Sequence, residues 1–211
     1  MGIVVGPHEV ELLPERAVYW PAAETLVVAD LHWGKGETFH AHGIPIPTAI
    51  LDDDLARLER ALLRTGATRL LVLGDLVHGA LAPSVIEAVA RWRVRCAVPT
   101  VLVRGNHDRH VPVLPRSWEI ADHVGTLRED GYAFTHAPEP TSGAYTWAGH
   151  IHPMAWLRGR TDALRLPCFH VGPEVGVLPA FGTFTGGVAV RPTRGDRLYV
   201  IAGTSVVPLA G

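Results

Sequence analysis

The sequence contains few cysteines and no long apolar run. Its two cysteines, Cys96 and Cys168, cannot form the disulfide framework of a small secreted protein. The most apolar long segment, residues 70–90, is interrupted by acidic residues, a histidine and a proline, so it does not predict a membrane-spanning helix. The N-terminal residues show neither the basic nor the apolar region of a signal peptide. We therefore expect a cytoplasmic protein with no membrane partner.

Basic charge is also scarce. The 19 Lys and Arg residues and the 21 Asp and Glu residues give a formal net charge of −2. Proteins that bind nucleic acid through their overall charge are typically basic, so any such binding must depend on bound metal ions or on local basic patches. Two groups of arginines are candidates for such patches: Arg91, Arg93 and Arg95, and Arg158, Arg160 and Arg165.

The chain shows no linker, no low-complexity segment and no internal repeat. Its hydrophobic fraction of 47% and charged fraction of 19% are those of an ordinary globular protein. A length of 211 residues allows one large domain or two small ones, and we expect a single domain over residues 1–211. Histidine is the residue in excess, with 12 copies, and this excess requires an explanation.

The pattern of apolar residues predicts an α/β fold. Apolar residues recur at helical spacing between positions 47 and 66, where Gly66 marks the expected end, and a second helix is expected from Pro83. From about residue 120 the pattern changes to short strands with Gly and Pro turns. This mixture favours two sheets with helices outside them. The predicted strands cover residues 25–29, 68–73, 100–103, 132–135 and 145–148.

Polar residues that can bind metals follow each of these strand-like runs. The runs end in Asp30 and His32, in Asp75 and His78, in Asn106, His107 and Asp108, in His136, and in His150 and His152. Ligand sites form where the carboxyl ends of strands converge, so we expect these side chains to meet. An extended backbone would place Asp30 and His32 on the same side of the chain, and likewise His150 and His152.

Burying so many polar groups together would cost several kcal/mol each unless something paired them. Divalent cations would provide that pairing. No thiolate is in the set, so a structural zinc site of the cysteine type is disfavoured. Carboxylate, amide and imidazole ligands suit manganese, iron or zinc, and the residues alone do not choose among them.

The motifs that carry these residues resemble those of the calcineurin-like metallophosphoesterases. They are "DLH", "GDLVH", "GNHD", a lone His136 and "GHIH", in this order. The resemblance implies a two-sheet sandwich flanked by helices, in four αββα layers. Longer stretches, such as "VVADLHWGKGETFHAHGIPIP" and "LPAFGTFTGG", resemble the bacterial DNA ligase-associated subgroup over nearly the whole chain. That subgroup implies a manganese-dependent DNA endonuclease or phosphodiesterase in DNA repair, with a ligase, a helicase and an exonuclease as partners.

The resemblance also implies two metal sites. One ion would be held by Asp30, His32 and His152, and the other by Asn106, His136 and His150, with Asp75 bridging the two. The ions, manganese or else iron or zinc, would activate a hydroxide for attack on phosphorus.

Three further residues are candidate catalytic residues. His107 would be the general acid that protonates the leaving oxygen, and Asp108 would orient it or raise its basicity. His78 stands where protein phosphatases of the superfamily continue into an Asp-Arg-Gly run, and repair nucleases carry His there. The family pattern places His78 on a non-bridging phosphate oxygen, which favours a phosphodiester substrate. We expect modest, salt-sensitive binding of single-stranded or structured DNA.

Other polar residues are expected outside the site. Asp52, Asp53 and Asp54 are interpreted as the solvated start of a helix, where the helix dipole favours carboxylates.

Lys35 is either a phosphate contact or a solvated loop lysine. Trp33 is expected to pack in the core, and its alternative is to stack on a base. Histidines 40 and 42 follow no strand and are at most substrate contacts. The "FGTFTGG" stretch has no predicted chemical role, and surface positions or backbone hydrogen bonds are expected for His8, His110, His123 and His170.

Two other functions agree with the same residues. A phosphatase or phosphodiesterase of small nucleotides would use the same metals in a closed pocket. A non-catalytic adaptor for repair proteins would keep the fold, but it would have no need of His107.

Overall fold

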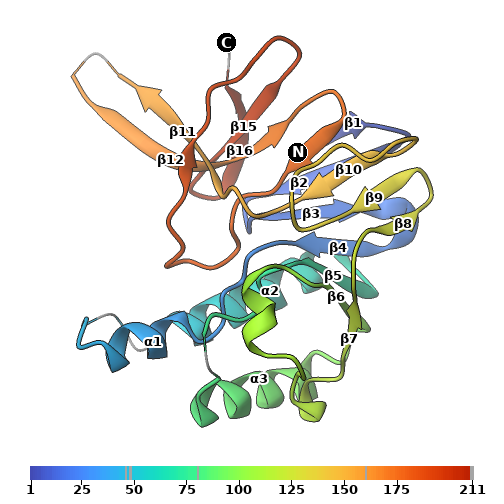
Figure 1. Ribbon diagram of the computed structural model, residues 1–211. Helices are drawn as coiled ribbons and strands as arrows, with labels where there is room; N and C mark the ends of the chain where they lie inside the picture. The colour runs from blue at the N-terminus through green and yellow to red at the C-terminus, as the bar shows by residue number, and fades with distance from the viewer. Residues whose placement is uncertain (46, 48, 80, 160, 210–211) are drawn as a thin grey trace.

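The computed structural model describes residues 1–45, 47, 49–79, 81–159 and 161–209. It contains two mixed sheets (Figure 1), the first with seven strands and the second with nine. The first sheet comprises β1 (Gly2–Val5), β2 (His8–Leu13), β3 (Ala17–Trp20), β4 (Thr25–Val28), β5 (Arg69–Leu73), β6 (Thr100–Val103) and β7 (Ile120–His123). The second comprises β8 (Leu127–Glu129), β9 (Tyr132–Phe134), β10 (Tyr145–Ala148), β11 (Pro153–Arg158), β12 (Ala163–Val171), β13 (Val175–Val177), β14 (Val188–Ala189), β15 (Arg197–Ala202) and β16 (Ser205–Leu209).

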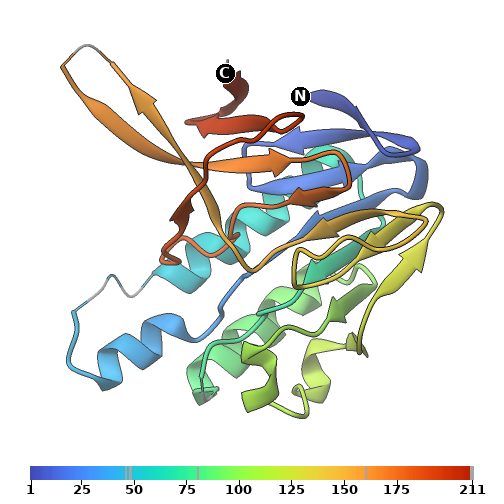
Figure 2. The same ribbon diagram turned by 45° about the horizontal axis from the view of Figure 1, so that its top comes forward.

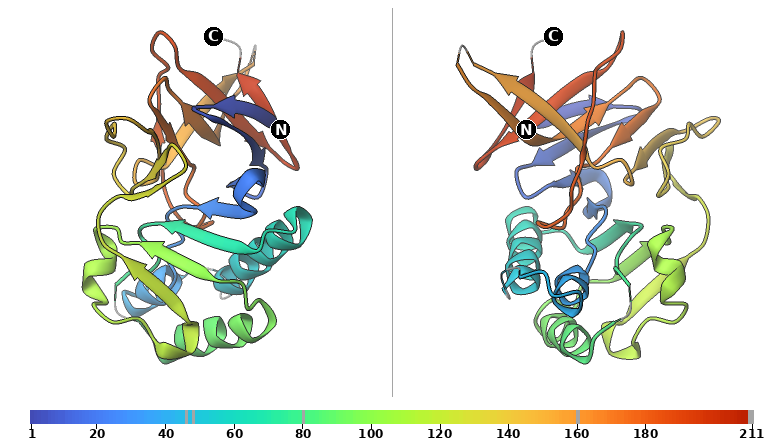
Figure 3. Two further views of the ribbon diagram at one scale, coloured as in Figure 1. Left: turned by 90° about the vertical axis from the view of Figure 1, so that its right-hand side faces the viewer. Right: turned by 60° about the vertical axis from the view of Figure 1, so that its left-hand side comes forward.

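Helices cover the outer face of the first sheet. These are α2 (Ile50–Thr65) and α3 (Pro83–Arg95), which both contribute buried residues to the core on that face. The short helix α1 (Lys35–Ala41) projects to the side in Figure 1, and short 3-10 turns occur at Pro21–Ala23, His107–His110 and Arg116–Trp118. In Figure 3 the helices lie on one side of strands β4–β7, and the strands of the second sheet lie on the other. The predicted sandwich of two sheets flanked by helices is therefore confirmed.

Alternation along the central strands divides the core into two layers. On β4, Leu26 and Val28 pack toward the helices, whereas Val27 between them packs toward the second sheet. The helix-side layer includes Leu58 of α2 and Trp92 of α3, and the layer between the sheets contains large aromatic residues such as Phe134 and Trp147. This alternation is the period of two that a strand buried on both faces shows.

The helix ends follow from the sequence. Helix α2 ends at Gly66, whose φ of 64° is the left-handed conformation that glycine adopts without strain, and its amide donates to the carbonyl of Leu62. Helix α3 begins at Pro83, where the missing amide proton costs nothing. Both helices were predicted, whereas the short helix α1 was not.

Strand direction sets the position of the candidate site. Strands β4, β5, β6 and β7 are parallel to one another, and so are β9, β10 and β13 in the second sheet. Their carboxyl ends therefore lie along common edges. The long β11–β12 hairpin extends away from the body of the protein (Figure 2). No described helix is long and apolar enough to cross a membrane.

Candidate metal centre

Segments that follow five strands bring the predicted ligands together. Asp30 and His32 follow β4, Asp75 follows β5 and Asn106 follows β6, all in the first sheet. His136 follows β9 of the second sheet, and His150 and His152 lie between β10 and β11. The site is therefore built between the two sheets rather than along the edge of one.

The side chains form two groups, in each of which the possible ligand atoms lie within 4.8 Å of one another. The first group is Asp30, His32 and His152, and the second is Asp75, His136 and His150. Asn106 belongs beside the second group, because its Oδ1 lies 2.8 Å from Nε2 of His136.

Asp75 faces both groups. Its Oδ1 lies 3.4 Å from Nε2 of His136, and its Oδ2 lies 3.9 Å from Nε2 of His32. The side chain is only 2% exposed, and the backbone amide of His107 donates a 2.9 Å hydrogen bond to Oδ1. One carboxylate thus presents one oxygen to each group, which is the geometry that a bridging ligand requires.

Several buried polar atoms in the first group have no hydrogen-bond partner among the described residues. They are Oδ1 of Asp30, both ring nitrogens of His32 and Nε2 of His152. Unpaired polar atoms in the interior cost about 1–3 kcal/mol each, more when charged, so this arrangement needs a ligand. A divalent cation fits, because every donor is a nitrogen or oxygen lone pair of the kind that manganese, iron or zinc accepts.

The second group also brings possible lone-pair donors together, although its buried nitrogens have hydrogen-bond partners. Nδ1 of His136 is 3.2 Å from the carbonyl of Leu73, which can accept its proton and leave a lone pair on Nε2. That Nε2 lies 3.0 Å from Nδ1 of His150 and 2.8 Å from the amide oxygen of Asn106. A divalent cation fits among these three atoms, because each can offer it a lone pair.

Five of the candidate ligands have a backbone conformation that is rare for residues other than glycine. The φ angles are 56° at Asp30, 51° at His32, 49° at Asp75, 72° at His150 and 53° at His152. Each such residue costs about 1–3 kcal/mol, and such strain gathers at functional sites. The expectation of extended pairs was therefore wrong: His150 and His152 turn toward different groups because both depart from the β conformation.

Two glycines allow these segments to approach one another. A Cβ atom at Gly74 would lie 2.2 Å from Nδ1 of His136, and one at Gly105 would lie 2.3 Å from Oδ1 of Asp75. Gly74 also has a φ of 73°. Any larger residue at either position would displace a candidate ligand.

Asp108 binds the backbone of the surrounding loops. Its carboxylate is fully buried and accepts hydrogen bonds from the amides of Gly105 at 2.8 Å and Val77 at 3.2 Å. Burial raises the pKa of this carboxyl group, although these amides oppose the shift. Any effect of Asp108 on His107 is therefore exerted through the loop that carries them both.

His78 and His107 lie side by side next to the first group. Their rings are stacked with centroids 5.1 Å apart, and each is within 5.4 Å of the ring of His32. The His107 side chain is 37% exposed and its Nε2 lies 4.0 Å from Oδ2 of Asp75. Burial and then the nearby charge of Lys35 lower the pKa of His78, and burial lowers that of His32 to about 2. Neutral imidazole is the form that binds metals.

The "FGTFTGG" segment, residues 181–187, supports the first group from outside. The carbonyl of Gly186 lies 3.0 Å from Nδ1 of His152, which leaves Nε2 of that ring directed at Asp30. The amide of Gly182 donates to the carbonyl of Asp30 at 3.1 Å. This second layer of contacts fixes the tautomer and orientation of a candidate ligand, a role that the sequence did not indicate.

Asp54 anchors this segment and is not part of a solvated helix start. It is only 4% exposed and accepts hydrogen bonds from Arg57 at 2.8 Å and from the amide of Thr183 at 3.1 Å. Arg16 donates to carbonyls of the same segment, including that of Gly182 at 3.2 Å. The interpretation of the three aspartates as solvated was wrong for this one, although Asp52 and Asp53 are exposed.

Other predicted residues lie outside the two groups. Trp33 is buried against Trp118, with ring centroids 5.5 Å apart, so it packs in the core as expected. Arg93 is buried and donates to the carbonyl of Val98, so it forms no basic patch. Arg91 forms an ion pair with Glu87, and Arg95 forms one with Glu59. Arg160, of the second predicted arginine group, lies outside the described residues.

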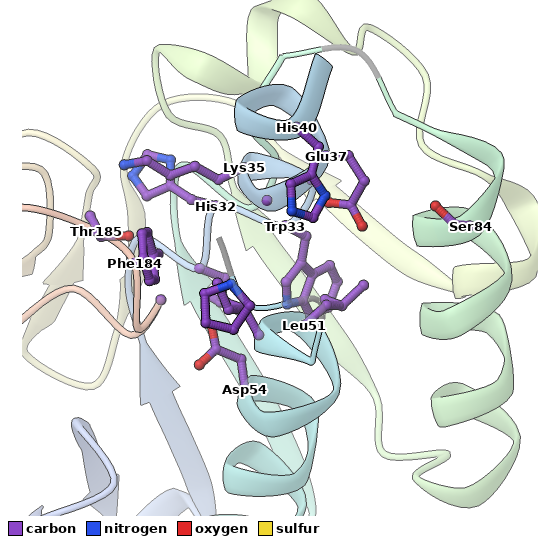
Figure 4. Close-up of a pocket in the computed structure, with 16 residues that line it drawn as sticks. His32, Trp33, Lys35, Glu37, His40, Leu51, Asp54, Ser84, Phe184 and Thr185 are labelled. Atoms are coloured by element: carbon purple, nitrogen blue, oxygen red, sulfur yellow. The ribbon is translucent and has the colours of Figure 1, made fainter. Parts of the chain in front are cut away.

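Two hollows flank the candidate centre. One, of about 210 Å³, has His32, Lys35 and Phe184 in its wall (Figure 4). The other, of about 810 Å³, is lined by Asn106 and Arg109 together with His136 and His150. A chain-like substrate that crosses the centre would have space on both sides.

The chain is similar to known proteins in sequence and in fold. A family model described as calcineurin-like phosphoesterase matches residues 24–177. The structure is similar to the crystal structure of the nuclease MPE of Pseudomonas putida, with a TM-score of 0.87 and 38% sequence identity over 99% of each chain. It also aligns with the phosphoesterase YfcE of E. coli, with a TM-score of 0.42 and 15% identity over 87% of this chain and 96% of that one. No curated protein sequence matches significantly.

Proposed function

Because the chain belongs to the calcineurin-like phosphoesterase family, we propose that it is a manganese-dependent nuclease that hydrolyses phosphodiester bonds in single-stranded or structured DNA. The observation that carries this proposal is the pair of ligand groups that share Asp75, in a chain similar over 99% of its length to a nuclease. In this proposal residues 1–211 form one domain, because side chains of both sheets share one core.

The proposed ligands follow the two groups. Asp30, His32 and His152 would hold one ion, and Asn106, His136 and His150 would hold the other, with Asp75 between them. When bound, the two ions would neutralise charge on the phosphate and activate water for its attack. Imidazole, amide and carboxylate ligands accept manganese, iron or zinc. Manganese is proposed because the sequence motifs resemble those of a manganese-dependent subgroup, and iron and zinc are the alternatives.

The chain's own residues would complete the reaction. His107 would donate a proton to the leaving oxygen, because its ring is partly exposed beside the centre and is not needed for either group. Asp108 would keep the Asn106–His107 loop in place through its bonds to backbone amides. His78, stacked on His107, would contact a non-bridging oxygen of the phosphate.

A polymeric substrate is favoured by the two flanking hollows, since a mononucleotide would need only one. The net charge of −2 implies modest binding that weakens as salt rises. A role in DNA repair, with a ligase, a helicase and an exonuclease as partners, is also proposed. Its support is the resemblance of the sequence motifs to the DNA ligase-associated subgroup.

The test is a nuclease assay on protein stripped of metal with a chelator. Manganese should restore cleavage of single-stranded and hairpin DNA better than magnesium, which accepts imidazole poorly. Nucleoside monophosphates and duplex DNA serve as competing substrates. Full activity in chelator with no metal by elemental analysis would refute the two-metal site. Rapid hydrolysis of nucleoside monophosphates without cleavage of DNA would show that the protein is a nucleotide phosphatase and not a nuclease.

A further inference from the structure

Lys35 is the only lysine of the chain, because the other 18 of its 19 basic residues are arginines. It follows the first ligand segment by three residues and begins α1. Its ammonium group is partly buried, and burial lowers its pKa. Among the described residues, Lys35 forms no ion pair with a carboxylate. A partly buried cation without an acidic partner favours the binding of an anion.

The surroundings of Lys35 are a pocket and not open solvent. The pocket, of about 210 Å³, begins at His32 of the first ligand group and continues between α1 and the 181–187 segment. Figure 4 shows His32, Lys35, Phe184 and Thr185 gathered at one end of it. An anion bound by Lys35 would therefore lie next to the candidate metal centre.

Phe184 presents an aromatic ring to this pocket. Phe184 is 42% exposed. Its ring contacts the ring of Phe39 edge to face, with centroids 6.3 Å apart. The centroid of the Phe39 ring lies 5.9 Å from Nζ of Lys35. The backbone before it is held by buried Asp54, which binds both the amide and the hydroxyl of Thr183. An exposed aromatic residue on a fixed loop loses little entropy when a planar ligand stacks on it.

Two carboxylates, Glu37 and Asp54, lie in the wall of the pocket. Asp54 is neutralised by its 2.8 Å ion pair with Arg57, so Glu37 remains as the acidic group that opposes an anion there. The hydroxyl of Thr185 is buried and has no hydrogen-bond partner among the described residues, so it is available to a ligand oxygen. The volume is below the roughly 300–1,000 Å³ of pockets for drug-sized ligands, which limits the occupant to about one nucleotide unit.

We propose that this pocket is the subsite for a nucleotide that flanks the scissile phosphodiester, with Lys35 binding its phosphate and Phe184 stacking on its base. The proposal rests on the nuclease function above, because that function supplies a chain in which a second phosphate and a base lie beside the bond that is cut. The stacking contact accepts any base, since every base presents a π face. The pocket therefore confers strand binding and not sequence specificity.

The single lysine allows a direct test that needs no metal and no turnover. The protein in chelator is acetylated with a limiting amine reagent at low ionic strength, and the modification of Lys35 is measured by mass spectrometry. The N-terminal amine of the same chain is the internal reference. A single-stranded oligodeoxythymidine should slow acetylation of Lys35 several-fold without affecting the N-terminal amine. Equal acetylation with and without the oligonucleotide would overturn the proposal.

Inorganic phosphate distinguishes a nucleotide subsite from a simple anion site. The oligonucleotide should protect Lys35 at concentrations far below those at which phosphate does. If phosphate protected equally well, the site would be a phosphate site alone and the role of Phe184 would be refuted.

Variants test the two contacts separately through the affinity for a fluorescent oligonucleotide in chelator. Phe184→Leu should weaken binding about tenfold, within the range for loss of one base–aromatic stack, and Phe184→Trp should restore it. Lys35→Gln should weaken binding and reduce its salt dependence, whereas Arg91→Gln removes one charge from the exposed face of α3 and should have a smaller effect. Equal effects of Lys35→Gln and Arg91→Gln, or of Phe184→Leu and Phe184→Trp, would contradict the assignment.

Failure of this inference is distinct from failure of the nuclease function. Wild-type protein that cleaves DNA with manganese but shows no protection of Lys35 would refute the subsite and leave the function. Protection of Lys35 by an oligonucleotide that is never cleaved would refute the function and leave only a pocket that binds oligonucleotides.

Discussion

Replacement of Asp54 by alanine should be among the most damaging substitutions outside the candidate ligands. Asp54 is 4% exposed and balances two partly buried arginines, Arg57 at 2.8 Å and Arg16 nearby. Burial, followed by repulsion from Arg57, already lowers the pKa of Arg16 to about 10. Without the carboxylate, these cations would remain partly buried and lose their acidic partner.

The expected magnitude follows from the loss of a buried ion-pair partner, which costs about 3–5 kcal/mol. In a chain of this size, each kcal/mol lowers the melting temperature by about 2–4 °C, so Asp54→Ala should melt about 6–20 °C below the wild type. Asp52→Ala is the matched control, because Asp52 lies in the same helical turn but is exposed. It should leave the free energy of unfolding nearly unchanged.

The same substitution should weaken the metal centre. The segment that Asp54 holds carries Gly186, whose carbonyl lies 3.0 Å from Nδ1 of His152, and loss of such outer contacts typically reduces metal affinity by about 10–100-fold. Urea unfolding would measure stability, and a manganese titration below the unfolding range would measure affinity. Equal behaviour of Asp54→Ala and Asp52→Ala in both assays would refute the anchoring role. Replacing Arg57 by methionine as well should recover part of the stability, because the penalty comes from the unpaired charge.

Four further substitutions test the centre itself. Asp75→Ala should lose both metal ions and nearly all turnover, because the single remaining carboxylate, that of Asp30, cannot offset two dications held close together; retention of two manganese ions per chain would contradict the bridge. His107→Ala should keep its metals and slow DNA cleavage by roughly 10²–10⁴-fold, with a smaller deficit on a nitrophenyl phosphodiester, whose leaving group departs without a proton. His78→Ala should slow the cleavage of both substrates by the same factor. If His107→Ala also lost the same factor in rate on both substrates, His107 would be a phosphate contact and not the general acid. Gly105→Ala should destabilise the protein by about 1–3 kcal/mol and lower metal affinity, because the new Cβ would lie 2.3 Å from Oδ1 of Asp75; crystals or spectra that show unaltered metal binding would contradict this reasoning.

The central strands and helices were predictable because their signals are local. The apolar runs that predict strands correspond to β4, β5, β6, β9 and β10, and the helical spacing before Gly66 corresponds to α2. The predicted ligands lie at the ends of these strands, and the structure gathers them. Their binding of metals stays a prediction, as do the roles of His78, His107 and Asp108.

What the sequence did not reveal depends on contacts between distant residues. Asp54 resembles its neighbours Asp52 and Asp53 in the sequence, and only Thr183, 129 positions away, explains its burial. The left-handed backbone of the ligand residues is also not local, because it is imposed by bonds such as that from the amide of His32 to the carbonyl of Asp75 at 2.9 Å. Short α1 lacks the length that makes a helical period visible.

The division of each ligand group between the sheets has a consequence for the lifetime of the protein in the cell. Asp30 and His32 come from one sheet and His152 from the other, so an ion bound there joins the two layers of the sandwich. A ligand that binds only the folded state stabilises it by about 2.7 kcal/mol at a hundred times its Kd. If the chain is the metal-dependent enzyme proposed above, starvation for the metal would both inactivate it and expose it to proteases. Its abundance in the cell would then follow the supply of that metal. Limited proteolysis with and without chelator would show this as faster cleavage of the stripped protein.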